Sequence, residues 1–417
     1  MKNNKFEWYF YFVVIYLVGF FSLSFFLWVT DVNSWCSNYI SFFSFFMLDS
    51  VGFFLSFLVF FIAGIILFNF YYNSSLNLFL LLFCCFVTIL TFFCVHSLGF
   101  WFFYETSILL ILFLIFKDSP YSDRFMAGWY LLFYSLFSGV PMLVVILYIS
   151  YLNNTFFLVD WFYTDSFCLF LLFLFFVTKI PIIPFHVWLP IVHAEASTIT
   201  SICLSGFIMK LGFLGLIRFG FYNLNDSIVF STYIILVLLS SVLIFFTSVE
   251  ELDLKRWLAM LSLCHIGVGL FSLFCLNILG CPSSMIFSLG HGLAASFFFY
   301  LILLLGNLGG SRSALNLSYI SGWSFSISWL LLIGFCFSAS FPPFINFFIE
   351  VWLVGLVSTN FFYFFILLSY LFFSSLIPLL LLGLSFSRRL NSSVGLNYNA
   401  LLLNSYFVFL GILLFVV

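Results

Sequence analysis

Four charged side chains lie in stretches that are otherwise apolar, and they are the residues best suited to chemistry. Glu105 is surrounded by aromatic and aliphatic residues, and Lys179 ends an apolar run. Lys210 lies in the middle of another run, and Glu350 follows a Pro-Pro pair. A charged side chain at the centre of a membrane helix costs about 2.5–3.5 kcal/mol on insertion scales. Side chains this costly predict a functional site.

Proton transfer is the chemistry that these four groups favour. Carboxylates and amines that are desolvated and paired bind or release a proton according to the state of their partner. Moving or protonating one partner therefore changes the other. The alternative is that the charges only form structural ion pairs, Glu105 with Lys179 and Glu350 with some other cation.

The five histidines fall into three groups. His265 and His291 lie within consecutive apolar runs, where they either carry protons between the charged sites or serve as core residues. His96 lies at the end of a run, and we expect it to be structural. His186 and His193 lie near each other without the H-E-x-x-H spacing of a zinc site. We expect these two to hydrogen-bond the termini of a broken helix.

No cofactor is predicted in this chain. Its ten cysteines include no C-x-x-C pair, and the sequence has no G-x-G-x-x-G nucleotide-binding pattern. Metal and iron–sulfur sites need clustered ligands at tight spacing. We expect the cysteines to be ordinary buried residues.

The elements that must position these residues are transmembrane helices. Hydrophobic residues make up 65% of the 417 positions and charged residues only 6%, against about 25% charged in soluble domains. Apolar runs of about 20 residues, long enough to cross a bilayer, recur along the chain. We predict an all-α polytopic bundle of thirteen spans, near 8–29, 50–71, 76–96, 99–116, 127–151, 166–189, 197–219, 228–248, 254–275, 283–305, 324–355, 361–383 and 398–417.

The basic residues test this count. With thirteen spans, nine of the twelve Lys and Arg residues fall on the side of the N-terminus, and only Arg218 lies near the opposite face. By the positive-inside rule the N-terminus then faces the cytoplasm, or the matrix of a mitochondrion. The nine residues are Lys2, Lys5, Lys117, Arg124, Lys255, Arg256, Arg312, Arg388 and Arg389.

Prolines interrupt two of the spans, the sixth at Pro181, Pro184 and Pro190 and the eleventh at Pro342 and Pro343. Interrupted helices at matching positions of inverted repeats indicate a transport site. We therefore predict two inverted five-helix repeats. The predicted units are 1–75 (N-terminal helices), 76–219 (first repeat), 220–383 (second repeat) and 384–417 (C-terminal loop and helix).

The segment from Lys179 to Glu195, KIPIIPFHVWLPIVHAE, closely resembles the signature of the antiporter-like subunits of respiratory complex I and of Mrp-type cation/proton antiporters. The resemblance covers about residues 101–350. Other matching segments follow the same order as in the family: Tyr104-Glu105-Thr106-Ser107, Met209-Lys210-Leu211-Gly212, Asp253-Leu254-Lys255-Arg256 through His265, His291-Gly292-Leu293, and Pro342-Pro343 through Asn346 and Glu350. Glu350 sets the chain apart from the sister chains 2 and 5 of that complex, which typically carry Lys there.

This resemblance implies that Glu105, Lys179 and Glu350 form a proton path. Lys210 and His265 would carry protons between half-channels. The sequence departs from the family pattern at Ser197, where Pro is common, at Ile349, where Gly is usual, and in having three spans rather than four before Glu105.

The implied function is outward proton pumping driven by NADH:ubiquinone electron transfer, with NADH, flavin, iron–sulfur clusters and quinone bound elsewhere in the complex. The implied location is the mitochondrial inner membrane, and the implied partners are the other membrane-arm subunits, especially chains 2 and 5, and lipids, with no nucleic acid. Two alternatives stay open: a subunit of an Mrp-type Na⁺/H⁺ antiporter, and a membrane-arm component that no longer pumps.

Overall fold

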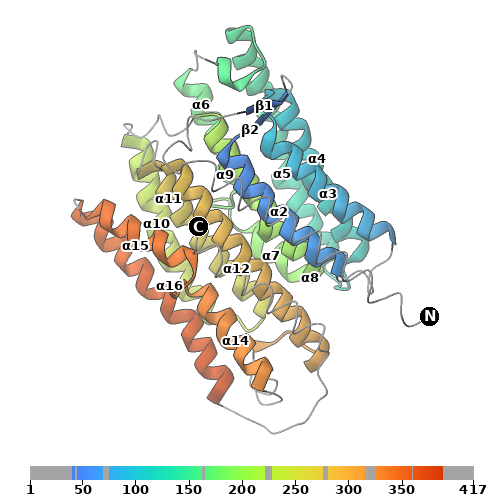
Figure 1. The fold of residues 1–417 in the computed structure, drawn as a ribbon, viewed down its shortest axis with the longest axis vertical. Helices are drawn as coiled ribbons and strands as arrows, with labels where there is room; N and C mark the ends of the chain where they lie inside the picture. Colours follow the sequence, from blue (N-terminus) through green and yellow to red (C-terminus); the bar gives the residue numbers. More distant parts are fainter. Residues whose placement is uncertain are drawn as a thin grey trace.

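A computed structural model describes most of the chain as a bundle of helices (Figure 1). One short antiparallel hairpin, β1 (Ile40–Phe42) and β2 (Phe46–Leu48), accompanies the helices. The predicted all-α class is therefore correct for the bundle, and the hairpin is an addition to it. The described residues are 40–42, 45–68, 75–161, 165–220, 228–275, 280–314, 317, 325–358 and 360–387.

Eight helical segments within the described residues are long and apolar enough to cross a membrane, so the chain is a multi-pass membrane protein. Helix is the expected form, because only a helix or a closed barrel satisfies its own backbone groups in lipid. The eight segments are α3 (Ser75–Phe93), α4 (Ser97–Asp118), α5 (Arg124–Asn153), the continuous α8 (Thr198–Cys203), η4 (Leu204–Ile208) and α9 (Met209–Arg218), then α10 (Ile228–Val249), α11 (Leu254–Cys275), α12 (Gly280–Gly309) and α16 (Phe361–Ser387).

Shorter elements complete the described bundle. They are α2 (Ser50–Phe68), η3 (Leu158–Asp160), α6 (Ser166–Lys179), α7 (Trp188–Glu195), α14 (Phe325–Ser338) and α15 (Ile345–Val357). Each of the eleven spans predicted between residues 50 and 383 coincides with a helix or with a pair of half-helices. The predicted spans at 8–29 and 398–417 lie outside the described residues.

Burial separates central helices from peripheral ones. In the segment that contains α9 and in α11, 94% of the membrane-spanning window is buried, against 33–44% in α3, α4, α5, α10 and α16. Figure 1 shows α3–α5 on one side of the bundle and α14–α16 on the other, with α9, α11 and α12 between them. The central helices therefore carry the interior in which charged residues can be shielded from lipid.

Both predicted interruptions are present, between α6 and α7 and between α14 and α15. Carbonyl groups freed by the first break accept hydrogen bonds from nearby side chains. Trp188 Nε1 donates to the carbonyl of Thr178 at 3.1 Å, and the Tyr233 hydroxyl donates to that of Ile183 at 3.1 Å. These bonds stabilise an irregular backbone that lipid alone would not tolerate. The second half-helix, α7, runs to Glu195, six residues beyond the predicted end of the span.

Candidate proton-transfer site

Glu105 of α4 and Lys179 of α6 form an ion pair in the interior of the bundle. Nζ of Lys179 lies 3.0 Å from Oε1 of Glu105, and the two side chains are only 7% and 14% exposed. The same nitrogen donates to the backbone carbonyl of Ser135 in α5 at 3.2 Å and lies 5.1 Å from the centre of the Tyr104 ring. The break places Lys179 at the very end of α6, where its amine reaches two other helices.

Glycine makes room for this pair. A Cβ atom at Gly139 of α5 would lie 2.3 Å from Oε1 of Glu105, so no larger residue fits there without moving the carboxylate. Trp101 Nε1 donates to the Gly139 carbonyl at 2.8 Å and fixes α4 against α5 at the same level. A cavity of about 20 Å³, enough for one water molecule, lies beside Lys179 and extends to Ile208, two residues before Lys210.

Lys210 lies fully buried at the start of α9, directly after the π-helical turn η4. Its Nζ donates to the backbone carbonyl of Ser205 within that turn and lies 3.2 Å from Nδ1 of His291 in α12. No carboxylate lies within ion-pair distance of Lys210 among the described residues. Lys210 is therefore held by neutral groups, one of which is titratable.

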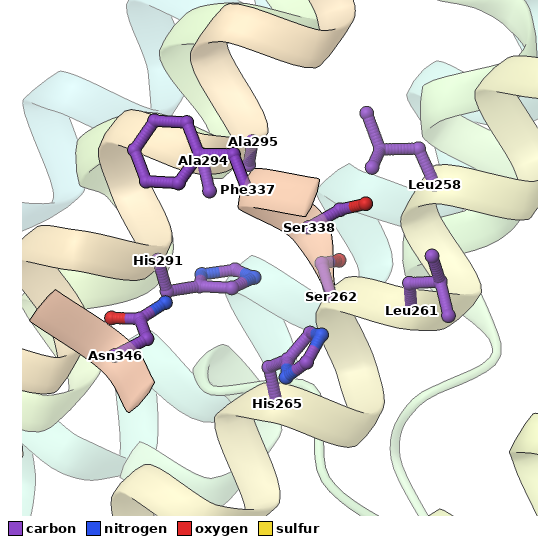
Figure 2. Close-up of a pocket in the computed structure, with 10 residues that line it drawn as sticks. All are labelled: Leu258, Leu261, Ser262, His265, His291, Ala294, Ala295, Phe337, Ser338 and Asn346. Atoms are coloured by element: carbon purple, nitrogen blue, oxygen red, sulfur yellow. The ribbon is translucent and has the colours of Figure 1, made fainter. Parts of the chain in front are cut away.

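His291 and His265 continue this polar row. Their ring centres are 5.6 Å apart, and both rings are buried. Figure 2 shows both rings at a small cavity of about 10 Å³, which Ser262, Ser338 and Asn346 also line. His265 Nδ1 lies 2.6 Å from the hydroxyl of Tyr370 in α16.

Glu350 lies in α15, one helical turn after Asn346, and is 3% exposed. The Ser340 hydroxyl, from the break between α14 and α15, donates to its Oε1 at 3.0 Å. None of the ion pairs among the described residues includes Glu350. The alternative that Glu350 forms a structural ion pair with another cation is wrong for this part of the chain.

The prediction for His193 was also wrong. Its ring is fully buried and stacks on Phe299 of α12 at 4.9 Å, but neither ring nitrogen has a hydrogen-bond partner. The charges of Lys255 and Lys210 act on it. His186 likewise has a buried Nδ1 without a hydrogen-bond partner. His193 is therefore held by stacking and not by hydrogen bonds to the helix terminus.

Three donors from separate segments of the chain bind the carbonyl groups at the end of α7. Arg312 donates to the carbonyl of Ala194, Ser119 to that of Glu195, and Lys255 to that of Ala196 at 2.9 Å. Both cations also lie over the ring of Tyr121, with Arg312 at 4.1 Å and Lys255 at 4.9 Å from its centre. We call these four side chains and three carbonyl groups the α7 clamp: Ser119, Tyr121, Lys255, Arg312 and the carbonyls of 194–196.

The other residues considered in the sequence have structural roles or no close partners for chemistry. His96 caps α4 by accepting a hydrogen bond from the Gly99 amide and packs among phenylalanine rings. Of the seven cysteines whose side chains are described, six are buried, Cys336 is partly exposed, and none forms a disulfide. Within the described ranges no three His, Cys, Asp or Glu side chains lie close enough together to hold a metal ion. Ser197, at the position where the related sequences commonly carry Pro, caps α8 by accepting from the Thr200 amide.

The structure thus brings five of the six predicted residues into two groups. Glu105 pairs with Lys179, and Lys210, His291 and His265 form the second group. Glu350 lies outside both groups and accepts a hydrogen bond from Ser340. Sequence reasoning missed Tyr370, Asn346, Gly139 and the α7 clamp. For Asn346 and Lys255 the signal was present, because both lie within segments of the motif series.

A family profile described as NADH:quinone oxidoreductase/Mrp antiporter, TM, matches residues 95–378, which include all six predicted residues. NADH-ubiquinone oxidoreductase chain 4 of Locusta migratoria is 34% identical over 297 residues, 68% of this chain and 66% of the relative. The same chain of Ceratitis capitata is 33% identical over 289 residues, 68% of this chain and 65% of the relative. The chain thus spans just under two thirds of the length of these curated relatives.

Two solved structures share the fold. A chain of respiratory complex I from Thermus thermophilus with bound NADH superposes with a TM-score of 0.77 at 19% identity, covering 90% of this chain and 85% of that chain. A chain of the Mrp complex from Dietzia sp. gives a TM-score of 0.71 at 15% identity, covering 84% and 68%. At these identities the likeness concerns the arrangement of helices alone.

Proposed function

The chain belongs to the NADH:quinone oxidoreductase/Mrp antiporter transmembrane family, and from this premise we propose that it is chain 4 of respiratory complex I and translocates protons. It would act as a subunit of the H⁺-translocating NADH:ubiquinone reductase. Glu350 supports chain 4, because the sister chains 2 and 5 typically carry Lys at the corresponding position. The relatives from Locusta and Ceratitis carry the chain 4 name as well.

The observation that carries this proposal is the buried pair of Glu105 and Lys179 at the helix break. At an effective dielectric of about 20, two unit charges 4 Å apart interact by about 4 kcal/mol. If Lys179 moves away from Glu105, each group loses that stabilisation of its charged form. A shift of the amine between Glu105 and the cavity beside it would therefore bind a proton in one position and release it in the other.

The other predicted residues supply a route away from this pair. Lys210 contacts His291, and His291 faces His265 across the cavity in Figure 2. Imidazole accepts a proton on one nitrogen and gives it up from the other, so a pair of histidines suits proton transfer. In this proposal Glu350 receives the proton at the end of the row and releases it outward.

We infer the repeat organisation and orientation on related grounds. Each proposed five-helix repeat, 76–219 and 220–383, contains one broken helix, and each break lies next to a buried charged residue, Lys179 or Glu350. Lys255 and Arg312 meet at Tyr121, between Lys117 and Arg124 in sequence, so these four basic residues belong to one end of the bundle. That end would face the matrix of a mitochondrion, in its inner membrane.

We further propose that this chain holds no redox centre and receives energy from neighbouring subunits. The lack of a metal-binding cluster among the described residues supports this view. Its partners would be the other membrane-arm subunits, especially chains 2 and 5, and the lipids around them. NADH, flavin, iron–sulfur clusters and quinone would then be bound by other chains.

Native gel electrophoresis followed by mass spectrometry tests this function directly. We expect the chain to migrate with flavin- and iron–sulfur-containing subunits, in vesicles whose NADH oxidation builds a membrane potential. Migration with Mrp subunits, together with Na⁺-dependent proton exchange and no response to NADH, would replace this function with the antiporter alternative.

A further inference from the structure

Tyr370 places a phenol in the interior of a helix that is otherwise almost wholly apolar. Its ring and hydroxyl are completely buried, and the hydroxyl lies 2.6 Å from Nδ1 of His265. Burying a hydroxyl in an apolar environment is costly unless it is hydrogen-bonded. The other large side chains buried in α16 are aliphatic, Ile366, Leu367, Ile377 and Leu381, so packing alone does not require a hydroxyl here.

The helix of Tyr370 also packs against the helix that carries Glu350. The phenol and the Glu350 carboxyl are close enough to interact electrostatically, and α16 packs against both α11 and α15. The Ser340 hydroxyl, which donates to Glu350, comes from the opposite side of the break. Tyr370 therefore contacts the last histidine of the row and lies within electrostatic reach of the terminal carboxylate.

The two nitrogens of His265 face different surroundings. Nδ1 meets Tyr370, whereas Nε2 has no hydrogen-bond partner of normal geometry and lies near the backbone of Ser338 at the cavity shared with His291 (Figure 2). A ring of this kind accepts a proton at one nitrogen and releases it from the other. The geometry assigns entry to Nε2 and exit to Nδ1.

Other polar groups near this cavity are less suited to the next step. The hydroxyls of Ser262 and Ser338 donate to carbonyls of their own helices at 2.7 and 3.0 Å. Asn346 lies close to α12, where a Cβ atom at Gly290 would be 2.1 Å from its Oδ1. An amide exchanges protons poorly with imidazole, so Asn346 orients the site and does not carry the proton.

We propose that Tyr370 is a proton-transfer residue that links His265 to Glu350; this inference rests on the proposed function. His265 Nδ1 gives its proton to the phenol oxygen while the phenol passes its own proton toward the Glu350 carboxylate. Tyr370 begins and ends each transfer as a neutral phenol, and no electrons are exchanged. The net result is one proton moved from His265 to Glu350.

Tyr370→Phe tests this link, because it removes the hydroxyl and keeps the ring. In vesicles that contain the assembled complex, we expect proton uptake driven by NADH oxidation to fall at least about tenfold, since a positioned proton-transfer group typically contributes 10²–10⁴-fold. Rates are normalised to the assembled complex on a native gel, so that loss of assembly cannot imitate loss of transfer.

Ser374→Ala is the matched control. Ser374 lies one turn further along the buried face of α16, and its hydroxyl donates to the Leu371 carbonyl of its own helix. This variant should pump at the wild-type rate. Combining Tyr370→Phe with His265→Phe should pump no more slowly than His265→Phe alone, because proton transfer through two groups in series stops when either one is removed. Additive losses would indicate a packing role and overturn the proposal.

Glu350→Gln separates this inference from the function on which it rests. If Glu350→Gln stops pumping while Tyr370→Phe pumps normally, the Tyr370 link is wrong and the proposed function stands. If Glu350→Gln and Tyr370→Phe both pump at the wild-type rate, the proposed path falls and the link falls with it.

Discussion

Nζ of Lys179 lies 3.0 Å from Oε1 of Glu105, although the two residues are 74 positions apart in the chain. The contact depends on the proline break, which ends α6 at Lys179 and directs the amine toward α4 and α5. Both groups are shielded from solvent, so the charge of one strongly affects the protonation of the other.

Glu105→Gln should nearly abolish proton pumping and coupled NADH oxidation while the complex still assembles. Glutamine keeps the shape and a hydrogen-bond acceptor but removes the charge that favours protonated Lys179. Membrane-potential formation in vesicles, read beside assembly on a native gel, measures both quantities.

Lys179→Ala should have the same effect, and the Glu105→Gln, Lys179→Ala double variant should be no worse than either single one. A purely structural ion pair gives a different pattern, because a buried charge left alone destabilises the fold. In that case the single variants would fail to assemble, and removing both charges would restore assembly in part.

Gly139→Ala should impair pumping without touching a charged residue. The new methyl group would lie 2.3 Å from Oε1 of Glu105, so the carboxylate must move away from Lys179. Overpacking of this kind costs roughly 1–3 kcal/mol. We expect slower NADH-driven proton uptake by an assembled complex.

Gly128→Ala in the same helix is the control for that experiment. Its methyl group would meet the ring of Phe116 at 2.3 Å and would not touch Glu105 or Lys179. The thermal stability of the complex should fall by a similar amount in both variants, but only Gly139→Ala should lose pumping. Equal pumping by the two variants would mean that the position of Glu105 does not matter.

The helices and their breaks could be predicted because the bilayer allows few alternatives. An apolar run of about 20 residues must hydrogen-bond its own backbone, and prolines remove that ability at known points. The pairing of Glu105 with Lys179 could be predicted too, because two opposite charges in an apolar bundle favour each other. The positions of apolar runs, prolines and charges therefore determine much of the architecture.

The inward faces of the helices could not be predicted. Tyr370 lies in a run of Phe, Leu and Ser whose apolar residues do not mark a buried face, since lipid and core are equally apolar. The π-helical turn before Lys210 contains no proline to mark it. His193 was assigned hydrogen bonds because polar side chains near a break usually make them, but Phe299 supplies a stacking surface from a distant helix.

Lys210→Gln should block transfer at the centre of the path. Glutamine still reaches the Ser205 carbonyl but cannot bring a proton to Nδ1 of His291. We expect proton uptake to fall at least about tenfold, within the range assigned to positioned proton-transfer groups. Lys210→Arg keeps a cation that does not release its proton, and it should fail as well. Activity in the arginine variant would show that charge alone, and not proton release, is needed at this position.

The orientation of the chain predicts a labelling pattern. Ser122 and Asp160 are exposed near opposite ends of α5, whose 30 residues span about 45 Å. A thiol reagent that cannot cross the membrane should label Ser122→Cys from the matrix side and Asp160→Cys from the other side. Wild-type complex, whose described cysteines are buried or partly so, is the control. Labelling of Ser122→Cys from the outer side would reverse the proposed topology.

Arg312→Gln should loosen the α7 clamp and with it the broken helix that carries Trp188 and His193. The guanidinium donates to the Ala194 carbonyl and stacks on Tyr121, so glutamine loses a charge-assisted hydrogen bond worth about 1.5–3 kcal/mol, a cation–π contact and the ion pair with Asp253. Hydrogen exchange measured by mass spectrometry should become faster in peptides that cover α7. Arg256→Gln removes the same charge from an exposed neighbour of Lys255 and should leave α7 exchange unchanged. If both variants accelerate exchange equally, the effect comes from net charge at this end of the bundle, and the clamp does not hold α7.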